Sequence, residues 1–213
     1  KKVWKDCLNI EINNIIFYMI FQLKSILQWY IFTLLTRRRI SMHNYKFTVS
    51  YDGTRYSGWQ SQGNTDNTIQ GKISNVLSRM TNTSVEIIGA GRTDAGVHAL
   101  EMTANAHFNT SLSEVEIRDY MNKYLPSDIC INDVSIVSER FHSRYNAVGK
   151  TYCYTCYIGP LKPVFDKKYV YCLNKTPDVQ LMKQAAKHLI GTHDFASFCS
   201  NTRMKKSTTR TID

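Results

Sequence analysis

Residues 45–51 read YKFTVSY, with apolar or aromatic residues alternating with polar ones. This period of two, carried by aromatic and β-branched residues, is typical of a strand with one buried face. A turn-rich stretch follows over residues 52–66, and apolar residues then return at helical spacing over 69–80, with Asn67 and Gln70 as the expected capping start. Because strands and helices are interleaved in this way, we expect an α+β fold with mainly antiparallel pairing.

The rest of the chain continues this pattern of short strands and helices. Segments with the composition of strands lie at 85–88, 103–108, 129–137, 148–158 and 207–213. Ser113 and Glu116 have the spacing of a capping box, which predicts a helix that ends near Pro126. A further helix is expected from residue 178 to Gly191, with Leu181 on its inward face.

The composition is that of an ordinary globular chain. Of its 213 residues, 43% are hydrophobic and 21% charged, with only 4 Pro and 10 Gly. These values exclude collagen-like, disordered and low-complexity classes. The 6 cysteines lie at irregular positions, which is typical of reduced thiols in a cytoplasmic protein and not of a disulfide scaffold.

Residues 1–41 differ in character from the rest of the chain. A mostly apolar run at 15–35 is long enough to span a bilayer, but Lys24 and other polar residues interrupt it. Three interpretations remain open: a membrane anchor, a fused helical hairpin, or a non-native extension from upstream of the true start. We favour the last, in which the segment is not part of the enzyme and no membrane association is expected.

The chain carries an excess of positive charge. Its formal net charge is +10, and residues 42–213 keep 20 basic and 15 acidic residues, a net charge of +5. Positive charge indicates a polyanionic partner, above all nucleic acid, or a membrane surface. Aromatic residues make up 12% of the chain, which suits stacking on bases.

The most informative loop is GAGRTDAGVHA at 89–99, which lies between two expected strands. Its glycines allow positive φ and a close approach of the backbone to a ligand. Asp94 is either the acceptor of an Asx-turn beside a surface arginine or a carboxylate presented for chemistry and kept ionised by a nearby cation. His98 is expected to pack or to form hydrogen bonds, since no serine or cysteine nucleophile lies nearby.

Together with its neighbours this loop resembles the tRNA pseudouridine synthase A (TruA) family. The motifs that carry the resemblance are YDGTRYSGWQ at 51–60, GRTDAGVHA at 91–99, LPSDI at 125–129, FHSR at 141–144, KTYCY at 150–154 and GTHDF at 191–195. The resemblance implies a pseudouridine synthase-like fold with ferredoxin- or RRM-like halves. It predicts an N-terminal α+β subdomain at 42–145 that carries the catalytic loop. An incomplete C-terminal subdomain would then occupy 146–213.

The same resemblance implies a reaction. Family members isomerise uridine to pseudouridine at positions 38–40 of the tRNA anticodon stem–loop, breaking the N1–C1′ bond and joining C5 to C1′. They need no cofactor or metal and work as cytoplasmic homodimers that grip one tRNA. Family chains continue past the equivalent of residue 213 with an arginine that ion-pairs with the catalytic aspartate. We therefore expect a truncated chain, and the alternative function is an inactive tRNA-binding fragment.

The resemblance also assigns roles to residues. Asp94 matches the catalytic aspartate, as nucleophile or as base; Arg92 matches the arginine that displaces the target base; and Tyr152 matches the tyrosine that packs against the uracil. Without the family match, Tyr152 is equally well one more aromatic residue on a strand. Candidate phosphate contacts are Arg55, Arg144, Lys150, Lys205, Lys206 and Arg210. No metal site is expected, because alternation places Cys153 and Cys156 on opposite strand faces.

Overall fold

The computed structural model describes Gln28 and residues 41–63, 65–199 and 207–213. The chain divides into two compact units, Lys1–Lys150 and Thr151–Asp213. The subdomain boundary expected between residues 145 and 146 stays a prediction. Except for Gln28, the apolar run at 15–35 lies outside the described residues. No helix of the described part is both long and apolar enough to cross a membrane.

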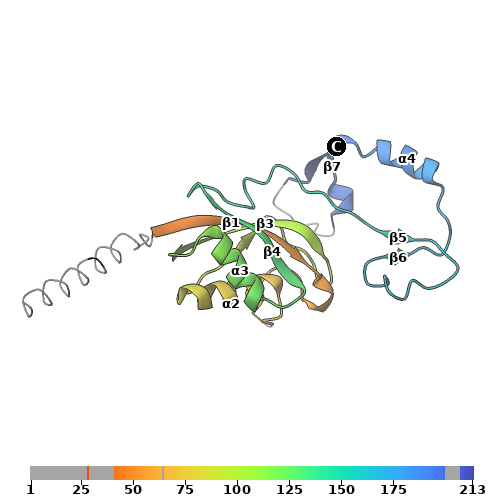
Figure 1. Ribbon diagram of the computed structural model, residues 1–213. Coiled ribbons are helices and arrows are strands. Elements are labelled where there is room, and N and C mark those ends of the chain that lie inside the picture. The colour runs from red at the N-terminus through yellow and green to blue at the C-terminus, as the bar shows by residue number, and fades with distance from the viewer. Residues whose placement is uncertain (1–27, 29–40, 64, 200–206) are drawn as a thin grey trace, which may run out of the picture. The chain divides into compact units, whose positions relative to one another are not determined.

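The first unit is built on a four-stranded sheet with the order β2-β3-β1-β4. Its strands are β1 (Ser41–Tyr51), β2 (Ile88–Gly89), β3 (Ala99–Thr110) and β4 (Ile129–Val137). Every neighbouring pair in this sheet is antiparallel, and β1 lies between β3 and β4 (Figure 1). The predicted α+β class with a mainly antiparallel sheet is confirmed, and β4 has the bounds expected from the sequence.

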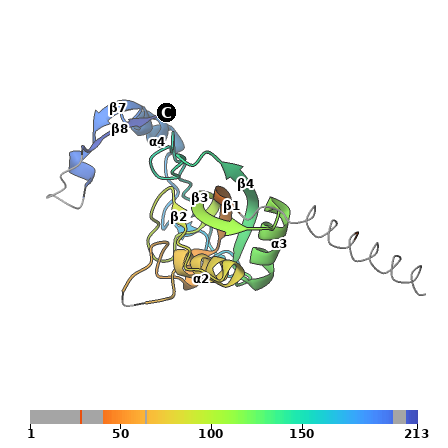
Figure 2. The ribbon, with the colours of Figure 1, turned by 90° about the vertical axis from the view of Figure 1, so that its left-hand side faces the viewer.

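Two helices, α2 (Ile69–Thr81) and α3 (Glu114–Tyr124), pack on one face of this sheet (Figures 1 and 2). The alternation in β1 is the reason, because it turns a row of apolar side chains toward the helices while the intervening polar residues face the other way. The buried members of that row are Tyr45, Phe47, Val49 and Tyr51. Against them the helices place residues at i and i+4, such as Ile73 with Leu77 and Ile117 with Met121.

The two helix starts show where local sequence decides the structure and where it does not. The capping box of α3 is confirmed, since the Ser113 hydroxyl accepts from the backbone N–H of Glu116 and the Glu116 carboxylate accepts from the N–H of Ser113. The expected start of α2 at Asn67 and Gln70 is wrong. Thr68 caps the helix by accepting from the N–H of Gly71, and Gln70 turns inward, where it is 3% exposed.

A buried polar cluster fastens the FHSR segment to the sheet. Asn44 of β1 and Asn105 of β3 are 0% and 1% exposed, and the Asn105 amide donates to the Asn44 side-chain oxygen at 3.0 Å. Asn44 in turn donates to the carbonyl of Phe141, and Asn105 accepts from the N–H of Ser143. The Ser143 hydroxyl donates to the carbonyl of Ile88 at 2.6 Å, directly before the glycine-rich loop. Burying these groups unpaired would be costly, so the cluster fixes the segment in one register.

The second unit contains short elements and no buried residue within its described part. They are β5 (Cys156–Tyr157), β6 (Tyr171–Cys172), α4 (Val179–Lys187), β7 (Gly191–Asp194), η2 (Ala196–Phe198) and β8 (Thr209–Ile212). β7 and β8 are antiparallel, and β8 confirms the strand expected at 207–213. The helix expected to reach Gly191 ends at Lys187, and Leu181 is 61% exposed instead of inward.

The long strand expected at 148–158 is wrong. Only Cys156–Tyr157 are in a strand there, paired in parallel with Tyr171–Cys172. Alternation in a sequence predicts a strand only where a neighbouring strand can take up its N–H and C=O groups and a core can cover one face. Residues 148–155 belong to no described strand and are all exposed, although the carbonyl of Thr155 accepts from the N–H of Tyr171 at 2.8 Å.

Candidate active site

The glycine-rich loop that joins β2 to β3 is held in place by the segment after β1. The backbone N–H of Trp59 donates to the carbonyl of Thr93 at 3.0 Å. The Thr93 hydroxyl shares a 2.9 Å hydrogen bond with the phenol of Tyr51. Thr93 is therefore anchored through both backbone and side chain. Its two neighbours, Arg92 and Asp94, are both exposed.

Gly58 makes this close approach possible. Its φ is +96°, and a Cβ added there would lie 2.5 Å from the carbonyl oxygen of Thr93 and 3.2 Å from the carbonyl carbon of Asp94. Only glycine combines this backbone conformation with contact against another backbone. The YSGWQ and GRTDAG motifs, which are distant in the chain, thus meet backbone to backbone.

Asp94 opens a tight turn. The N–H of Val97 donates to the Asp94 carbonyl at 3.2 Å, and Gly96 has φ +80°, as the third position of a type II turn requires. The turn is closed by the backbone carbonyl and not by the carboxylate, so the Asx-turn interpretation is not supported. At the far end of the loop, His98 Nδ1 lies 3.2 Å from the N–H of Gly53 and 3.0 Å from Asp52 Oδ1, a hydrogen-bonding role as expected.

Arg92 is paired with an amide and not with the carboxylate two residues away. Its Nε donates to Gln60 Oε1 at 3.2 Å. Within the described residues no ion pair or hydrogen bond reaches the Asp94 side chain. No ion pair therefore joins Arg92 to Asp94 among the described residues, and the nearby cation expected for Asp94 stays a prediction. The loop instead presents an exposed carboxylate and an exposed guanidinium. The guanidinium is held by Gln60, and the backbone next to the carboxylate is held through Thr93.

Asp128 of the LPSDI motif ties the segment after β1 to the start of β4. Its carboxylate accepts from the Tyr56 hydroxyl at 2.5 Å and from Arg55 Nη2 and Nε at 2.6 and 2.9 Å. Burial and then the hydrogen bond to Asp128 raise the pKa of Tyr56 to about 12. Burial alone would raise the pKa of Asp128, but the hydrogen bonds from Tyr56 and Arg55 outweigh it, and the pKa is lowered.

These shifts predict a pH dependence of stability. An unfolded tyrosine loses its proton near pH ~10, whereas folded Tyr56 keeps it to about pH 12. The free energy of unfolding should therefore fall as pH rises through this window. It should also fall in acid, as pH drops through the lowered pKa of Asp128.

Urea unfolding of the full chain at several pH values would test this dependence. Tyr56→Phe should lessen the alkaline fall without removing it, since burial also raises the pKa of Tyr45 and Tyr51. Replacing the exposed Tyr145 with phenylalanine should leave the alkaline decrease in the free energy of unfolding the same as in the original chain. An alkaline fall unchanged by Tyr56→Phe would contradict the prediction.

Comparisons with known proteins decide the family. A family profile of tRNA pseudouridine synthases matches residues 48–146 and 185–213. The chain is 50% identical over 171 residues to the tRNA pseudouridine synthase A 2 of Bacillus cereus, covering 80% of this chain and 70% of that protein. It is 49% identical to the corresponding protein of Bacillus anthracis and 47% identical to tRNA pseudouridine synthase A 1 of Clostridium tetani, with the same coverage. The chain belongs to the tRNA pseudouridine synthase A family. It is thereby assigned to the isomerases.

The synthase's predicted RNA-binding residues fall into three groups. Arg55, Arg144 and Lys150 belong to the first unit and are exposed, although Arg55, with its side chain 68% exposed, is already paired with Asp128. Lys150 reaches the glycine-rich loop, where its Nζ would lie 2.9 Å from a Cβ added at Gly91. Lys205 and Lys206 lie outside the described residues. The phosphate contacts of all these residues stay predictions.

Tyr152 and Arg210 belong to the second unit. Tyr152 is 72% exposed and stands outside any strand, so neither the strand position expected for it nor a buried core role applies. The Arg210 guanidinium donates to the carbonyls of Ser207 and Thr209 at 2.9 and 2.6 Å. The structure thus places Arg92 and Asp94 on one loop, which Lys150 approaches at Gly91, while the roles of Tyr152 and Arg210 stay predictions.

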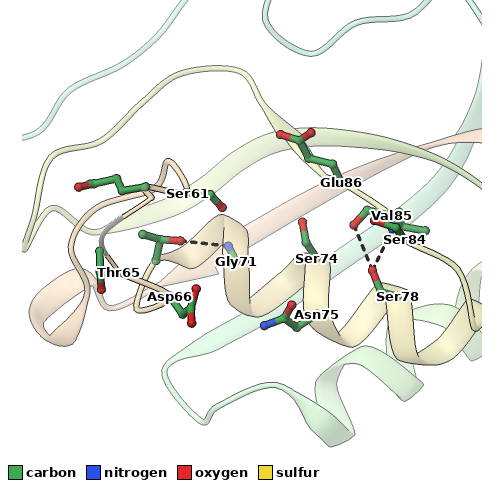
Figure 3. A pocket seen from close by; sticks show the side chains of 12 residues that line it. Ser61, Thr65, Asp66, Gly71, Ser74, Asn75, Ser78, Ser84, Val85 and Glu86 are labelled. Atoms are coloured by element: carbon green, nitrogen blue, oxygen red, sulfur yellow. Dashed lines mark hydrogen bonds between the residues drawn. The ribbon is translucent and has the colours of Figure 1, made fainter.

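A polar hollow of about 280 Å³ lies elsewhere, between α2 and the segment before β2 (Figure 3). Ser74 and Ser78 of α2 line it together with Ser84, and its charged lining residues are Asp66 and Glu86. A hollow with two carboxylates and no lysine or arginine among its lining residues does not suit a phosphate backbone. Asp94 and Arg92 are not part of it. No group of three potential metal ligands occurs among the described residues, Cys153 and Cys156 included.

The sequence does not predict that Gln60 and Gln70 support Arg92. Gln60 accepts from Arg92, and Gln70 accepts from Gln60. Gln60 is half-buried and comes directly after the GW pair, and Gln70 sits on the buried face of α2. A glutamine at a core-facing position of an amphipathic helix is a signal in its own right, because a buried amide must find partners. The pattern around residue 67 instead suggests a capping role for Gln70, whose real partners are distant in sequence.

Proposed function

We propose that this chain isomerises uridine to pseudouridine at positions 38–40 of the tRNA anticodon stem–loop, with Asp94 as the catalytic carboxylate. The observation that carries the proposal is the exposed Asp94 on a turn whose backbone is held by Trp59 and Tyr51 through Thr93. The backbone of Asp94 is held in place, and its carboxylate has no protein partner among the described residues. It can therefore contact a ribose or a base without first giving up a hydrogen bond or an ion pair.

The reaction itself needs few groups. The N1–C1′ bond breaks, the uracil turns, and C5 bonds to C1′. The hydrogen on C5 leaves as a proton and N1 takes up a proton from water, so that the product is an isomer of the substrate. Asp94 acts either as a nucleophile on the substrate or as a base that removes a sugar proton; both require the ionised carboxylate in contact with the nucleotide. Nothing is oxidised or reduced, so the side chains of the protein suffice.

Arg92 is proposed to take the place of the displaced base. A base in a stem must leave its stack before chemistry, at a cost of a few kcal/mol, least where pairing is already weak. A planar guanidinium next to the catalytic carboxylate can stack in the vacated position and bind phosphate. Lys150, over the same loop, is a second candidate for phosphate. Tyr152 is proposed to pack against the uracil.

The proposal includes a homodimer as the species that binds tRNA. Residues 42–213 have a net charge of only +5, which is modest for a single chain that must hold a large polyanion. Light scattering should then give twice the chain mass of 24.6 kDa. A monomer with undiminished tRNA affinity would contradict this part of the proposal.

Tritium release tests the activity directly. The full chain is incubated with tRNA that carries tritium at C5 of uridine, because isomerisation must eject that hydrogen. We expect release from tRNA with uridines at 38–40 and none when cytidines replace them. Salt-sensitive tRNA binding without release would indicate a binding protein instead of an enzyme. Release that persists in the cytidine-substituted tRNA would refute the proposed positions.

A further inference from the structure

Two glutamines form a relay of amides behind Arg92. Gln70, 3% exposed, uses its whole hydrogen-bonding capacity: its Oε1 accepts from Gln60 Nε2 and from the N–H of Ser61, both at 2.9 Å. Its Nε2 donates to the carbonyl of Ile87 at 2.8 Å and to Glu86 Oε1 at 2.9 Å. Gln60 then accepts from Arg92 Nε at 3.2 Å. The relay thus runs from the segment before β2 through Gln70 of α2 and Gln60 to the guanidinium.

Backbone groups fix the direction of this relay. An amide side chain could in principle be flipped, exchanging its oxygen and nitrogen. The N–H of Ser61 can only donate and the carbonyl of Ile87 can only accept, so Gln70 has a single satisfactory orientation. Gln60 must therefore present its nitrogen to Gln70. Its oxygen is left pointing at Arg92, which can only donate.

We propose that Gln60 and Gln70 are positioning residues that hold the Arg92 guanidinium in the orientation needed to enter the RNA stem. This inference rests on the role proposed for Arg92 above. Arginine has five N–H donors, and the relay occupies the one on Nε. Arg92 is exposed, and no hydrogen bond within the described residues engages its terminal nitrogens, so their four donors remain available to base and phosphate. Fixing a long side chain beforehand removes an entropic cost from each encounter with substrate.

The direct test measures the Nε–H of Arg92 by NMR in the ¹⁵N-labelled full chain. The resonance is assigned by its loss in Arg92→Lys. Gln60→Met keeps the volume of the side chain and removes both of its relay bonds. We expect hydrogen exchange at Arg92 Nε to become about tenfold faster in this variant, as for a lost charge-assisted hydrogen bond. An unchanged exchange rate would overturn the proposal.

A matched variant controls for local disturbance. Gln62→Met alters a glutamine two residues away whose Nε2 donates to the carbonyl of Ser57 and not to the relay. It should leave the Arg92 exchange rate as it is in the original chain. Gln70→Met would also break the relay, but it strips buried partners from Ser61 and Ile87 and is expected to destabilise the fold. The decisive variant is therefore Gln60→Met.

A double-mutant cycle on the isomerisation rate separates positioning from general damage. Gln60→Met should lower the rate about tenfold when Arg92 is present, and should lower it no further in an Arg92→Ala background. Two losses that simply multiply would show that Gln60 acts apart from Arg92 and would overturn the positioning role. If the original chain forms no pseudouridine, the proposed function fails, while the exchange measurement still decides whether the relay holds Arg92.

Discussion

Asp94→Asn should abolish tritium release from C5-labelled tRNA, with a loss of about 10⁴-fold or more, while tRNA binding persists. The expected size comes from removing a group that must carry a negative charge in every version of the mechanism. Asparagine has nearly the same shape but is neither a useful base nor a useful nucleophile. The tritium assay reports the chemistry itself, and electrophoretic mobility shifts report binding.

The structure explains why this variant should fold. The turn at Asp94 is closed by its backbone carbonyl and the N–H of Val97, and the loop is held through Thr93. No hydrogen bond within the described residues depends on the Asp94 carboxylate. The melting temperature should therefore stay within about 2 °C of the original, the scale of a change near 0.5 kcal/mol or less.

Asp119→Asn provides the control for losing one negative charge. Asp119 is exposed on α3 and pairs only with its neighbour Arg118, at 2.8 Å, among the ion pairs of the described residues. The Asp119→Asn variant should release tritium at the rate of the original chain. Residual release above about one hundredth of that rate in Asp94→Asn would assign the essential carboxylate elsewhere. Equal losses in the two variants would point to a general effect of charge.

Much of the fold is predictable because its signals are local. The alternation in β1, the helical spacing in α2 and the capping box at Ser113 each depend on residues within one element. The failure at 148–158 has the opposite cause, since a strand exists only where a partner and a core are supplied. Cys156–Tyr157 find such a partner in β6, whereas residues 148–155 are exposed and belong to no described strand.

The candidate site likewise has a part that the local sequence predicts and a part that it does not. Arg92 and Asp94 are close together in one motif, so the sequence alone selects them. Their supports come from far away: Gln60 contacts Arg92 across thirty-two residues, and Tyr51 contacts Thr93 across forty-two. Such contacts depend on how two loops meet at the end of the sheet, and no local pattern encodes that. The role of Thr93 as the anchor between two exposed residues is evident only from the structure.

Gly58→Ala should reduce isomerisation about 100-fold although residue 58 does not contact substrate in the proposed mechanism. An alanine Cβ would lie 2.5 Å from the Thr93 carbonyl oxygen, so the loop backbone has to move. The bond from the Trp59 N–H to that oxygen would lengthen, and Asp94 and Arg92 would shift with it. Displacements of about 1 Å at reacting groups cost rates of this order. The positive φ adds strain of about 1–3 kcal/mol to the folded state.

Gly63→Ala is the matched control. Residue 63 lies in the same connection between β1 and α2, its φ is not in the positive range, and an added Cβ would meet nothing within 4 Å. It should leave the isomerisation rate and the melting temperature nearly unchanged. If Gly58→Ala lowers the melting temperature but not the rate, the catalytic loop tolerates displacement and its backbone anchoring serves stability alone. A rate loss at a temperature where the variant remains fully folded would show instead that the position of the Thr93 carbonyl sets the geometry of Asp94, and that the two motifs act as one site.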